Sequence, residues 1–306
     1  MSTLRDALRT SSQRTIRALA MGLLLLGGCG TLRPTTSELR MSMYEPRTDS
    51  SSEAFTPRER PSSRGCLLVL LPGIGDDPSD FERNGFVRDV AAHSSDCEVV
   101  LVDAHLMFYL AQTMTERIAM DVLYPAHRHG YRSVWLVGIS LGGYGAILTA
   151  RAYPDLVDGV VLIAPMLGVP PREDGVAREI IAAGGLHGWP GLDALAPAPR
   201  HHFREPRLVW DWLRDVTLTR PESLVLAFGE EDRYEQRHRL LARAMDPSRV
   251  FAAPGEHEWK TWRRLWNDVL SSEPWSTATP AMCPDIGSSP APAAQSEAAE
   301  LAAAAC

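Results

Sequence analysis

Short apolar runs alternate with longer amphipathic segments between residues 63 and 275. Each run is rich in Val, Leu and Ile and predicts a buried strand, at residues 66–71, 98–103, 134–137, 159–164, 224–228 and 249–253. The segments between them carry apolar side chains at helical spacing and predict helices at residues 80–93, 115–129, 234–245 and 259–270, with another beginning after residue 140. Continuous apolar strands that alternate with helices predict an α/β fold, in which a mostly parallel sheet is sandwiched by helices.

One segment interrupts this alternation. Residues 167–221 are irregular, rich in Pro, Gly and Trp, and lie between two predicted strands. The carboxyl ends of parallel strands share one edge of the sheet, and ligands bind along that edge. We therefore expect this insertion to form a small cap over the edge. Its tryptophans either line an apolar pocket for an acyl group or anchor the cap itself.

The first 28 residues have the pattern of an export signal. Arginines precede an apolar run at residues 18–26, which is too short for an ordinary membrane span. The run ends in Leu26-Gly-Gly-Cys29, which resembles the lipobox of bacterial lipoproteins and predicts that Cys29 becomes a lipidated N-terminus. Gly30 and Thr31 directly follow Cys29, so no acidic residue stands there, and by resemblance this favours the outer membrane, facing the periplasm. The alternatives are an ordinary secretory signal cleaved nearby or an uncleaved anchor.

The segments that flank the predicted domain have little to bury. Residues 29–62 are rich in Ser, Thr, Pro and charge and predict a flexible, lipidated tether, with a short edge strand at residues 39–44. Residues 276–306 are rich in Pro, Ala and Ser and predict a disordered tail with a short helix at residues 297–305. The folded domain is therefore expected at residues 63–275, a length typical of one domain.

The charge balance excludes one class of partner. The formal net charge is −7, and the arginine-rich leader is positive, so the remainder of the chain is more acidic still. An acidic domain argues against nucleic acid as a partner. The spacing of cysteines and histidines matches no zinc motif, so we expect no metal.

The motif Gly138-Ile-Ser-Leu-Gly142 lies between a predicted strand and a predicted helix. In that context, G-x-S-x-G is typical of a nucleophile elbow, a sharp turn that exposes the serine hydroxyl. A side chain at either glycine would collide with the neighbouring backbone. The positive end of the following helix stabilises anionic charge near the hydroxyl. We predict that Ser140 is a nucleophile; the alternative is an ordinary Gly-rich turn.

A serine nucleophile needs a histidine base that a carboxylate holds in one tautomer. Elbow-type enzymes supply these residues in the chain order Ser, Asp or Glu, His. His257 follows the last predicted strand, in the loop Pro254-Gly-Glu-His-Glu-Trp259, and is the predicted base. The other histidines precede the serine, fall in the insertion or, as His238, lie among charged residues of a predicted helix, where we expect solvation.

The carboxylate is expected after the preceding strand, in the segment Phe228-Gly-Glu-Glu-Asp-Arg233. The G-x-x-D spacing favours Asp232 as the orienting residue. Glu230 and Glu231 are then expected to be solvated loop charges, and Glu256 and Glu258 surface charges.

An acyl-transfer intermediate also needs two backbone N–H groups that bind its oxyanion. The residue after the nucleophile, Leu141, is expected to supply one. The other is expected from the loop after the first core strand, Leu71-Pro-Gly-Ile-Gly-Asp-Asp77, with Ile74 as first choice and Gly75 as second. The alternative for this loop is a plain Gly-rich turn.

Five segments, LLPGIGDD, VGISLGGYG, VVLIAP, FGEED and PGEHEW, occur in this order between residues 63 and 272. Together they resemble the α/β-hydrolase superfamily. The resemblance implies a cofactor-independent serine hydrolase of small-molecule acyl substrates, with Ser140, Asp232 and His257 as the triad, and it does not separate esterases, lipases, thioesterases and peptidases. Two features depart from the family: no leading antiparallel strands are evident, so the sheet is expected to be trimmed, and Pro72 stands where many members have histidine.

The resemblance also bears on two cysteines. Cys66 and Cys97 both begin strands that are neighbours in the family's sheet order, and an exported chain meets an oxidising compartment. They are expected to form a disulfide or to remain two buried thiols.

These inferences predict an exported, lipid-anchored serine esterase of the bacterial cell envelope. One alternative is a thioesterase, amidase or acyltransferase that uses the same triad. Another is a non-catalytic envelope protein with a hydrolase fold, which would require the three side chains to lie far apart. A nucleotide-binding α/β domain is disfavoured, because Gly73 and Gly75 lack a third glycine at the required spacing.

Overall fold

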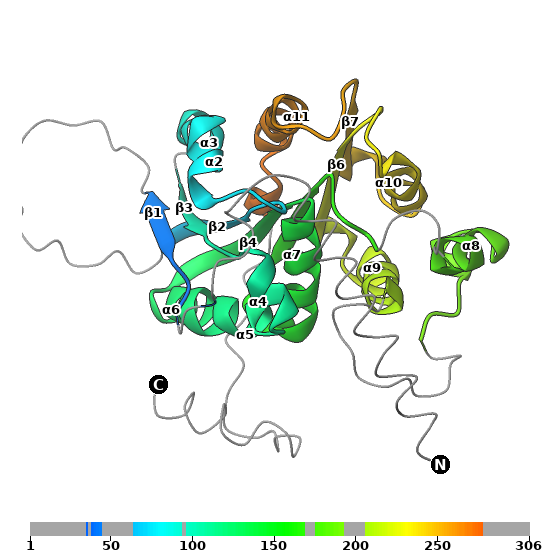
Figure 1. Ribbon diagram of the computed structural model, residues 1–306, viewed down its shortest axis with the longest axis horizontal. Helices are drawn as coiled ribbons and strands as arrows, with labels where there is room; N and C mark the ends of the chain where they lie inside the picture. The colour runs from blue at the N-terminus through cyan, green and yellow to red at the C-terminus, as the bar shows by residue number, and fades with distance from the viewer. Residues whose placement is uncertain are drawn as a thin grey trace, which may run out of the picture.

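A seven-stranded sheet runs through the centre of the fold (Figure 1). The computed structural model describes residues 35, 38–44, 64–93, 96–168, 175–192 and 206–277. The predicted leader, Cys29, most of the tether and the tail from residue 278 lie outside these residues. In spatial order the strands are β1 (Met41–Tyr44), β3 (Cys97–Val102), β2 (Arg64–Leu71), β4 (Tyr131–Ile139), β5 (Gly159–Ile163), β6 (Leu224–Gly229) and β7 (Val250–Ala253).

The sheet is mostly parallel. Only β1 pairs antiparallel, with β3, whereas the other neighbouring strands in the described part of the chain run parallel. All six predicted strands are present, and β1 lies within the predicted edge strand at residues 39–44. The parallel arrangement brings the carboxyl ends of β2, β4, β5, β6 and β7 to one edge, so loops that are distant in the sequence meet there.

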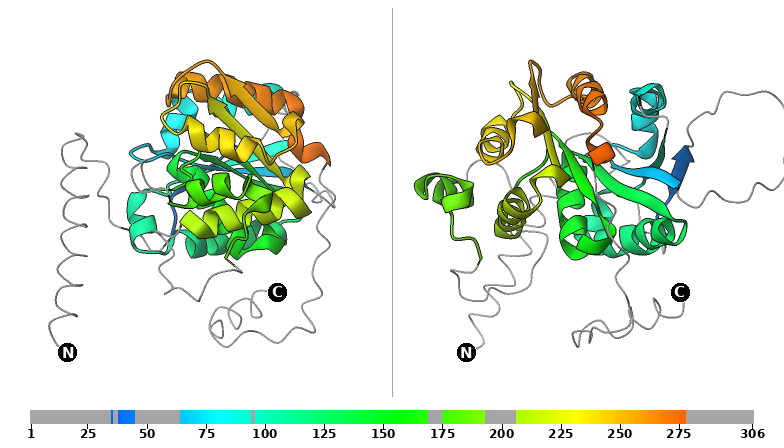
Figure 2. Two further views of the ribbon diagram at one scale, coloured as in Figure 1. Left: turned by 90° about the vertical axis from the view of Figure 1, so that its right-hand side faces the viewer. Right: turned by 180° about the vertical axis from the view of Figure 1, so that it is seen from behind.

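Helices cover both faces of the sheet (Figure 2). One face carries α4 (Leu106–Leu110), α5 (Met114–Ile118), α6 (Tyr124–Arg128), α7 (Leu141–Ala152), α9 (Pro206–Thr219) and α10 (Glu235–Ala242). The other carries α2 (Pro78–Arg83), α3 (Phe86–His93) and α11 (Trp259–Ser272). Alternate residues of β2 point into opposite clusters: Leu67 and Val69 face α7, whereas Leu68 and Leu70 face α11. Burial on both faces explains why the strands read as continuous apolar runs.

The prediction of one continuous helix at residues 80–93 is wrong. The segment forms two helices, α2 and α3, separated by a turn at Asn84 and Gly85. Gly85 has a φ of 83°, a left-handed conformation that glycine adopts without steric cost. The turn lets α2 begin at the Asp77 cap while α3 packs against α11.

The predicted helix at residues 115–129 is present but contains an irregular turn. A π-helical turn, Ala119–Leu123, joins α5 to α6. Pro125 follows this turn, and proline lacks an N–H and would collide with the carbonyl four residues before it. Widening the helix by one residue is a known way of relieving such a collision. The preceding helix α4 was not predicted.

The described part of the insertion at residues 167–221 adds helices to one face of the sheet. Of its described residues, α8 (Gly175–Ala182) lies outside α9, and α9 packs beside α7 in the layer that covers the sheet (Figure 1). Trp210 is fully buried and Trp189 nearly so, both in the core cluster on that face. These two side chains therefore anchor the layer and do not line an open acyl pocket.

A disulfide joins the beginning of β2 to the first residue of β3. Cys66 and Cys97 are register partners with a Cα–Cα distance of 4.5 Å, and a disulfide connects them. This bond closes a loop with a sequence separation of 31 residues. A crosslink of this span restricts the unfolded chain and is typically worth about 2–4 kcal/mol.

Candidate active site

The turn between β4 and α7 places Ser140 at the carboxyl edge of the sheet. Its backbone has φ 52° and ψ −111°, a strained conformation for a residue with a side chain. A β-carbon on Gly138 would collide with the Gly142 backbone, and one on Gly142 would collide with the carbonyl of Leu71. The two glycines are thus required by close backbone approaches, and those approaches fix the direction in which the serine hydroxyl points.

Three side chains from three loops meet at this edge. His257 Nε2 lies 3.0 Å from Ser140 Oγ, and His257 Nδ1 lies 2.6 Å from Asp232 Oδ2. Ser140 and Asp232 are buried, whereas His257 is partly exposed. Asp232 follows β6 and His257 follows β7, so the parallel sheet brings together residues that lie 117 and 25 positions apart.

The hydrogen bonds assign the proton positions. An ionised carboxylate only accepts hydrogen bonds, so His257 donates from Nδ1 to Asp232. The lone pair on Nε2 is then free to accept the proton of the Ser140 hydroxyl. Burial raises the pKa of Asp232, but the hydrogen bonds from His257 and from the backbone N–H of Tyr234, together with attraction to His257 and His238, outweigh burial, and the net pKa lies below its ordinary value. The carboxyl is therefore ionised at neutral pH.

Neighbouring groups hold the histidine in place. The His257 ring lies edge-on between Tyr234, at 5.3 Å between centroids, and Trp262, at 5.0 Å. The side chain of Glu231 accepts a hydrogen bond from the N–H of Gly255, which ties the loop after β6 to the loop after β7. Glu231 is exposed, as expected for a solvated loop charge, and it also positions the loop that carries His257. Tyr234 and Trp262 were not predicted as site residues.

The two predicted oxyanion donors flank the serine. Leu141 is the first residue of α7, and the first N–H groups of a helix have no acceptor within it. Ile74 lies in the turn that the N–H of Asp76 closes on the carbonyl of Gly73, at 3.4 Å. A β-carbon built on Gly73 would lie 3.6 Å from Ser140 Cβ, so this turn runs directly beside the serine.

A second carboxyl group, that of Asp76, lies on the same turn. Its Oδ1 accepts a hydrogen bond from Trp259 Nε1 at 3.2 Å, and its Oδ2 would lie 2.5 Å from a β-carbon on Gly73. Burial raises the pKa of Asp76; the Trp259 hydrogen bond opposes this, and so does attraction to His257. Sequence reasoning missed this residue, because the doublet of Asp76 and Asp77 resembles an ordinary helix start.

The expectation that His238 is solvated is wrong. This residue is fully buried, and its Nε2 donates a hydrogen bond to the carbonyl of Pro165 at 2.9 Å. Burial lowers the pKa of His238 to about 4. The Pro165 segment in turn contacts the elbow, since the N–H of Met166 donates to the carbonyl of Ser140 at 2.9 Å. His238 therefore supports the elbow from behind as a neutral side chain.

Among the residues that the structure describes, no cluster of His, Cys, Asp or Glu could hold a metal ion. Within the same residues, no helix has the length and apolar character needed to cross a bilayer.

Comparison with known proteins gives one family match. Residues 116–197 match the family described as "Serine aminopeptidase, S33". The matched segment contains Ser140 and the elbow, and it ends before Asp232 and His257. No curated protein matches the chain in sequence.

Many solved structures resemble the chain at low sequence identity. FphF, a fluorophosphonate-binding serine hydrolase of Staphylococcus aureus, has a TM-score of 0.47 and 15% identity over 76% of this chain and 90% of its own. Est1E from Butyrivibrio proteoclasticus has a TM-score of 0.46 and 14% identity, covering 70% and 88%. A ferulic acid esterase has a TM-score of 0.44 and 14% identity, covering 71% and 86%. At this level of similarity none of them indicates a substrate for this chain.

Proposed function

We propose that this chain, a serine hydrolase of the α/β type, cleaves small-molecule acyl esters through Ser140, His257 and Asp232. The observation that carries the proposal is the continuous pair of hydrogen bonds, 3.0 Å and 2.6 Å, from serine to histidine to carboxylate. A hydroxyl is a poor nucleophile until a base removes its proton, and this arrangement provides the base in the correct tautomer.

The first half of the reaction forms an acyl-enzyme. Ser140 Oγ attacks the carbonyl carbon, and its proton passes to His257 Nε2. The carbonyl π electrons move to oxygen, and the N–H groups of Leu141 and Ile74 stabilise the resulting oxyanion. Asp232 stabilises the imidazolium while remaining ionised. When the oxyanion collapses, the bond to the leaving alcohol breaks and the alcohol takes the proton from Nε2.

The second half regenerates the enzyme. A water molecule gives a proton to His257 Nε2 as its oxygen attacks the acyl carbon. Collapse of the second tetrahedral intermediate releases the carboxylic acid, and the proton returns from Nε2 to Ser140 Oγ. No step requires a metal or an organic cofactor.

The proposed location depends on the N-terminal segment. We propose that Cys29 is lipidated after removal of residues 1–28, and that the tether holds the domain at the outer membrane, facing the periplasm. Globomycin, which blocks lipoprotein signal cleavage, is expected to cause the unprocessed precursor to accumulate. A Cys29→Ala variant should be insensitive to the compound, and unchanged processing of the natural chain would contradict the lipoprotein proposal.

A fluorophosphonate probe tests the nucleophile. The probe should label the natural chain and fail to label Ser140→Ala, which should also lose at least about 10⁴-fold in kcat on a simple ester. Ser271→Ala is the matched control, because Ser271 is exposed and hydrogen-bonds only to its own helix. Equal labelling of the natural chain and Ser140→Ala would remove the proposed mechanism.

The leaving group is tested by a matched series. An ester, a thioester and an amide of the same acyl group should be compared with Ser140→Ala as blank. We expect the highest kcat/KM for the ester, and a preference for the thioester or the amide would replace the esterase proposal with the corresponding activity on the same triad.

A further inference from the structure

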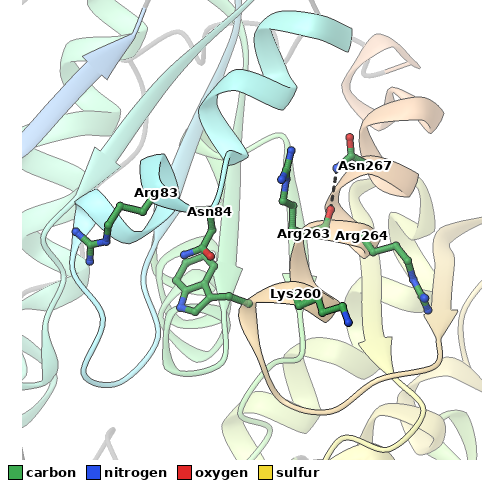
Figure 3. Close-up of a pocket in the computed structure, with 7 residues that line it drawn as sticks. Arg83, Asn84, Lys260, Arg263, Arg264 and Asn267 are labelled. Atoms are coloured by element: carbon green, nitrogen blue, oxygen red, sulfur yellow. Dashed lines mark hydrogen bonds between the residues drawn. The ribbon is translucent and has the colours of Figure 1, made fainter.

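A positively charged cavity lies beside the proposed catalytic site. It has a volume of about 490 Å³ and lies between the end of α2 and the first turns of α11 (Figure 3). Its lining consists of four cationic side chains, two amides and one indole: Arg83, Lys260, Arg263, Arg264, Asn84, Asn267 and Trp259. None of these lining residues is acidic, although the chain as a whole carries a net charge of −7. Such a local excess of positive charge attracts anions.

Arg263 is held rigidly at the cavity wall. Its Nε and Nη2 donate to the Asp89 carboxylate at 2.9 and 3.0 Å, and Asn267 donates to Asp89 at 3.0 Å. The Asp89 side chain is buried, so this guanidinium is fixed before any ligand arrives. Fixed donors lose less conformational freedom on binding than mobile ones do.

Two other cations add uncompensated charge. Within the described residues, neither Lys260 nor Arg264 forms an ion pair, and both are exposed. Arg264 Nη2 donates to the carbonyl of Pro254 at 2.8 Å, which fixes the guanidinium without neutralising it.

Trp259 connects this cavity to the catalytic site. The indole lines the cavity, and its Nε1 donates to Asp76, which together with Ser140 flanks Gly73. Trp259 also follows His257 by two residues in the chain. A ligand that reached from the cations to the serine would pass this indole. The apolar indole face suits the carbon part of such a ligand.

We propose that this cavity binds a phosphate or similar anionic group of a small-molecule ligand, and that the preferred ester substrates carry such a group away from the scissile carbonyl. The donors are of the kinds that bind phosphate in proteins: a positioned guanidinium and further cations. The second clause rests on the esterase proposal, whereas the first is independent of it.

The binding site is tested without turnover. Titration calorimetry of inorganic pyrophosphate into full-length Ser140→Ala should detect binding. Adding Lys260→Glu and Arg264→Glu should weaken that binding by about tenfold or more. The matched control adds Arg128→Glu and Arg243→Glu, which make the same change in net charge at exposed positions on α6 and after α10 and should leave the affinity within about twofold. No binding, or an equal loss in both variants, would overturn the proposal.

The substrate class is tested with two ester series. Each series uses one acyl group and alcohols that end in either a phosphate or a hydroxyl, joined by spacers of increasing length. In the Lys260→Glu enzyme, which keeps the hydrogen bond from Arg264 to the loop that carries His257, kcat/KM should fall by at least about threefold for the best phosphate ester and stay unchanged for the hydroxyl ester. A fall of equal size for both esters would contradict the role in substrate binding.

Two further outcomes separate the possible failures. If Ser140→Ala binds pyrophosphate but the natural chain hydrolyses no ester, the esterase proposal fails and the anion site stands. Membrane phospholipids carry the same anionic chemistry, so the variants should also be sedimented with phosphatidylglycerol and phosphatidylcholine vesicles. Charge-dependent binding to the former without pyrophosphate binding would overturn the small-molecule site in favour of a membrane surface.

Discussion

Two histidines lie near the Asp232 carboxylate, and they differ in burial and in hydrogen-bond partner. His257 follows β7 in a loop, is partly exposed, and donates directly to Asp232 at 2.6 Å. His238 belongs to α10, is fully buried, and donates to the carbonyl of Pro165. Asp232 attracts a proton on His238 as well, but burial dominates and lowers the pKa of His238 to about 4. One histidine is therefore placed to move protons, and the other is kept neutral.

The two histidines also differ in whether they can reach Ser140. His257 reaches the serine because its loop lies on the carboxyl edge of the sheet, between the rings of Tyr234 and Trp262. His238 lies beneath that edge, where its hydrogen bond holds the segment that contacts the elbow. The comparison teaches that closeness to the proposed catalytic carboxylate does not make a histidine a base. A base also needs a hydrogen-bond partner on each ring nitrogen and a path to the substrate.

The largest expected effect comes from Asp232→Asn. An asparagine that donates from its amide to Nδ1 would favour the wrong tautomer of His257, so Nε2 would carry the proton and could not accept one from Ser140. We expect kcat to fall by about 10⁴-fold on a simple ester, with KM changed much less. Fluorophosphonate labelling should slow in parallel. A loss smaller than about tenfold would mean that Asp232 does not orient the base.

Most of this edge could be predicted from the sequence because its geometry follows from strand order. Ser140, Asp232 and His257 each follow a strand that reads as an apolar run, and parallel strands bring those positions together. The structure also joins Cys66 to Cys97, one of the two outcomes that their positions allowed.

The features that the sequence did not predict depend on how side chains pack in three dimensions, which the order of residues along the chain does not reveal. The segment around His238 is strongly charged, yet His238 shares a helix face with Leu241, three residues on, and that face is buried. The tryptophans at residues 189 and 210 were open to two interpretations, and the choice depended on where α9 lies. The cavity between α2 and α11 joins segments more than 170 residues apart, so no local pattern indicates it.

The next largest effect concerns stability, and it tests the buried histidine. The unfolded chain binds a proton at His238 below about pH 6.5, whereas the folded protein does so only below about pH 4. The unfolded state therefore binds more protons between these values, and stability is lost as the pH falls through this window. The shift corresponds to an upper limit of roughly 3 kcal/mol.

Two substitutions separate titration from hydrogen bonding at this position. Glutamine can keep a donor to Pro165 without titrating, so His238→Gln should retain stability at pH 7 and lose most of the decline between pH 6.5 and 4. His238→Leu leaves the buried Pro165 carbonyl without its donor and should cost about 1–3 kcal/mol at pH 7. Urea unfolding of the three proteins at pH 4, 5, 6 and 7 measures both effects. An unchanged decline in both variants would assign the acid sensitivity to other groups.

The smallest expected effect comes from Asp76→Asn, which tests whether a carboxylate near His257 matters through its charge alone. Electrostatic attraction to His257 partly offsets the effect of burial on the pKa of Asp76, but the hydrogen bond of Asp76 runs to Trp259 Nε1 and leaves the tautomer of His257 unaffected. Asp76→Asn removes one negative charge near the base, as Asp232→Asn does, and asparagine can still accept from Trp259. We therefore expect less than about a tenfold change in kcat for a neutral ester, measured beside Asp232→Asn under the same conditions. Asp77→Asn is the matched control, since asparagine also caps helices and Asp77 caps α2. If Asp76→Asn lowered kcat as much as Asp232→Asn, negative charge near the His257 ring would matter more than the hydrogen bond between His257 and Asp232. A direct hydrogen bond to the carboxylate would then no longer explain why His257 differs from His238.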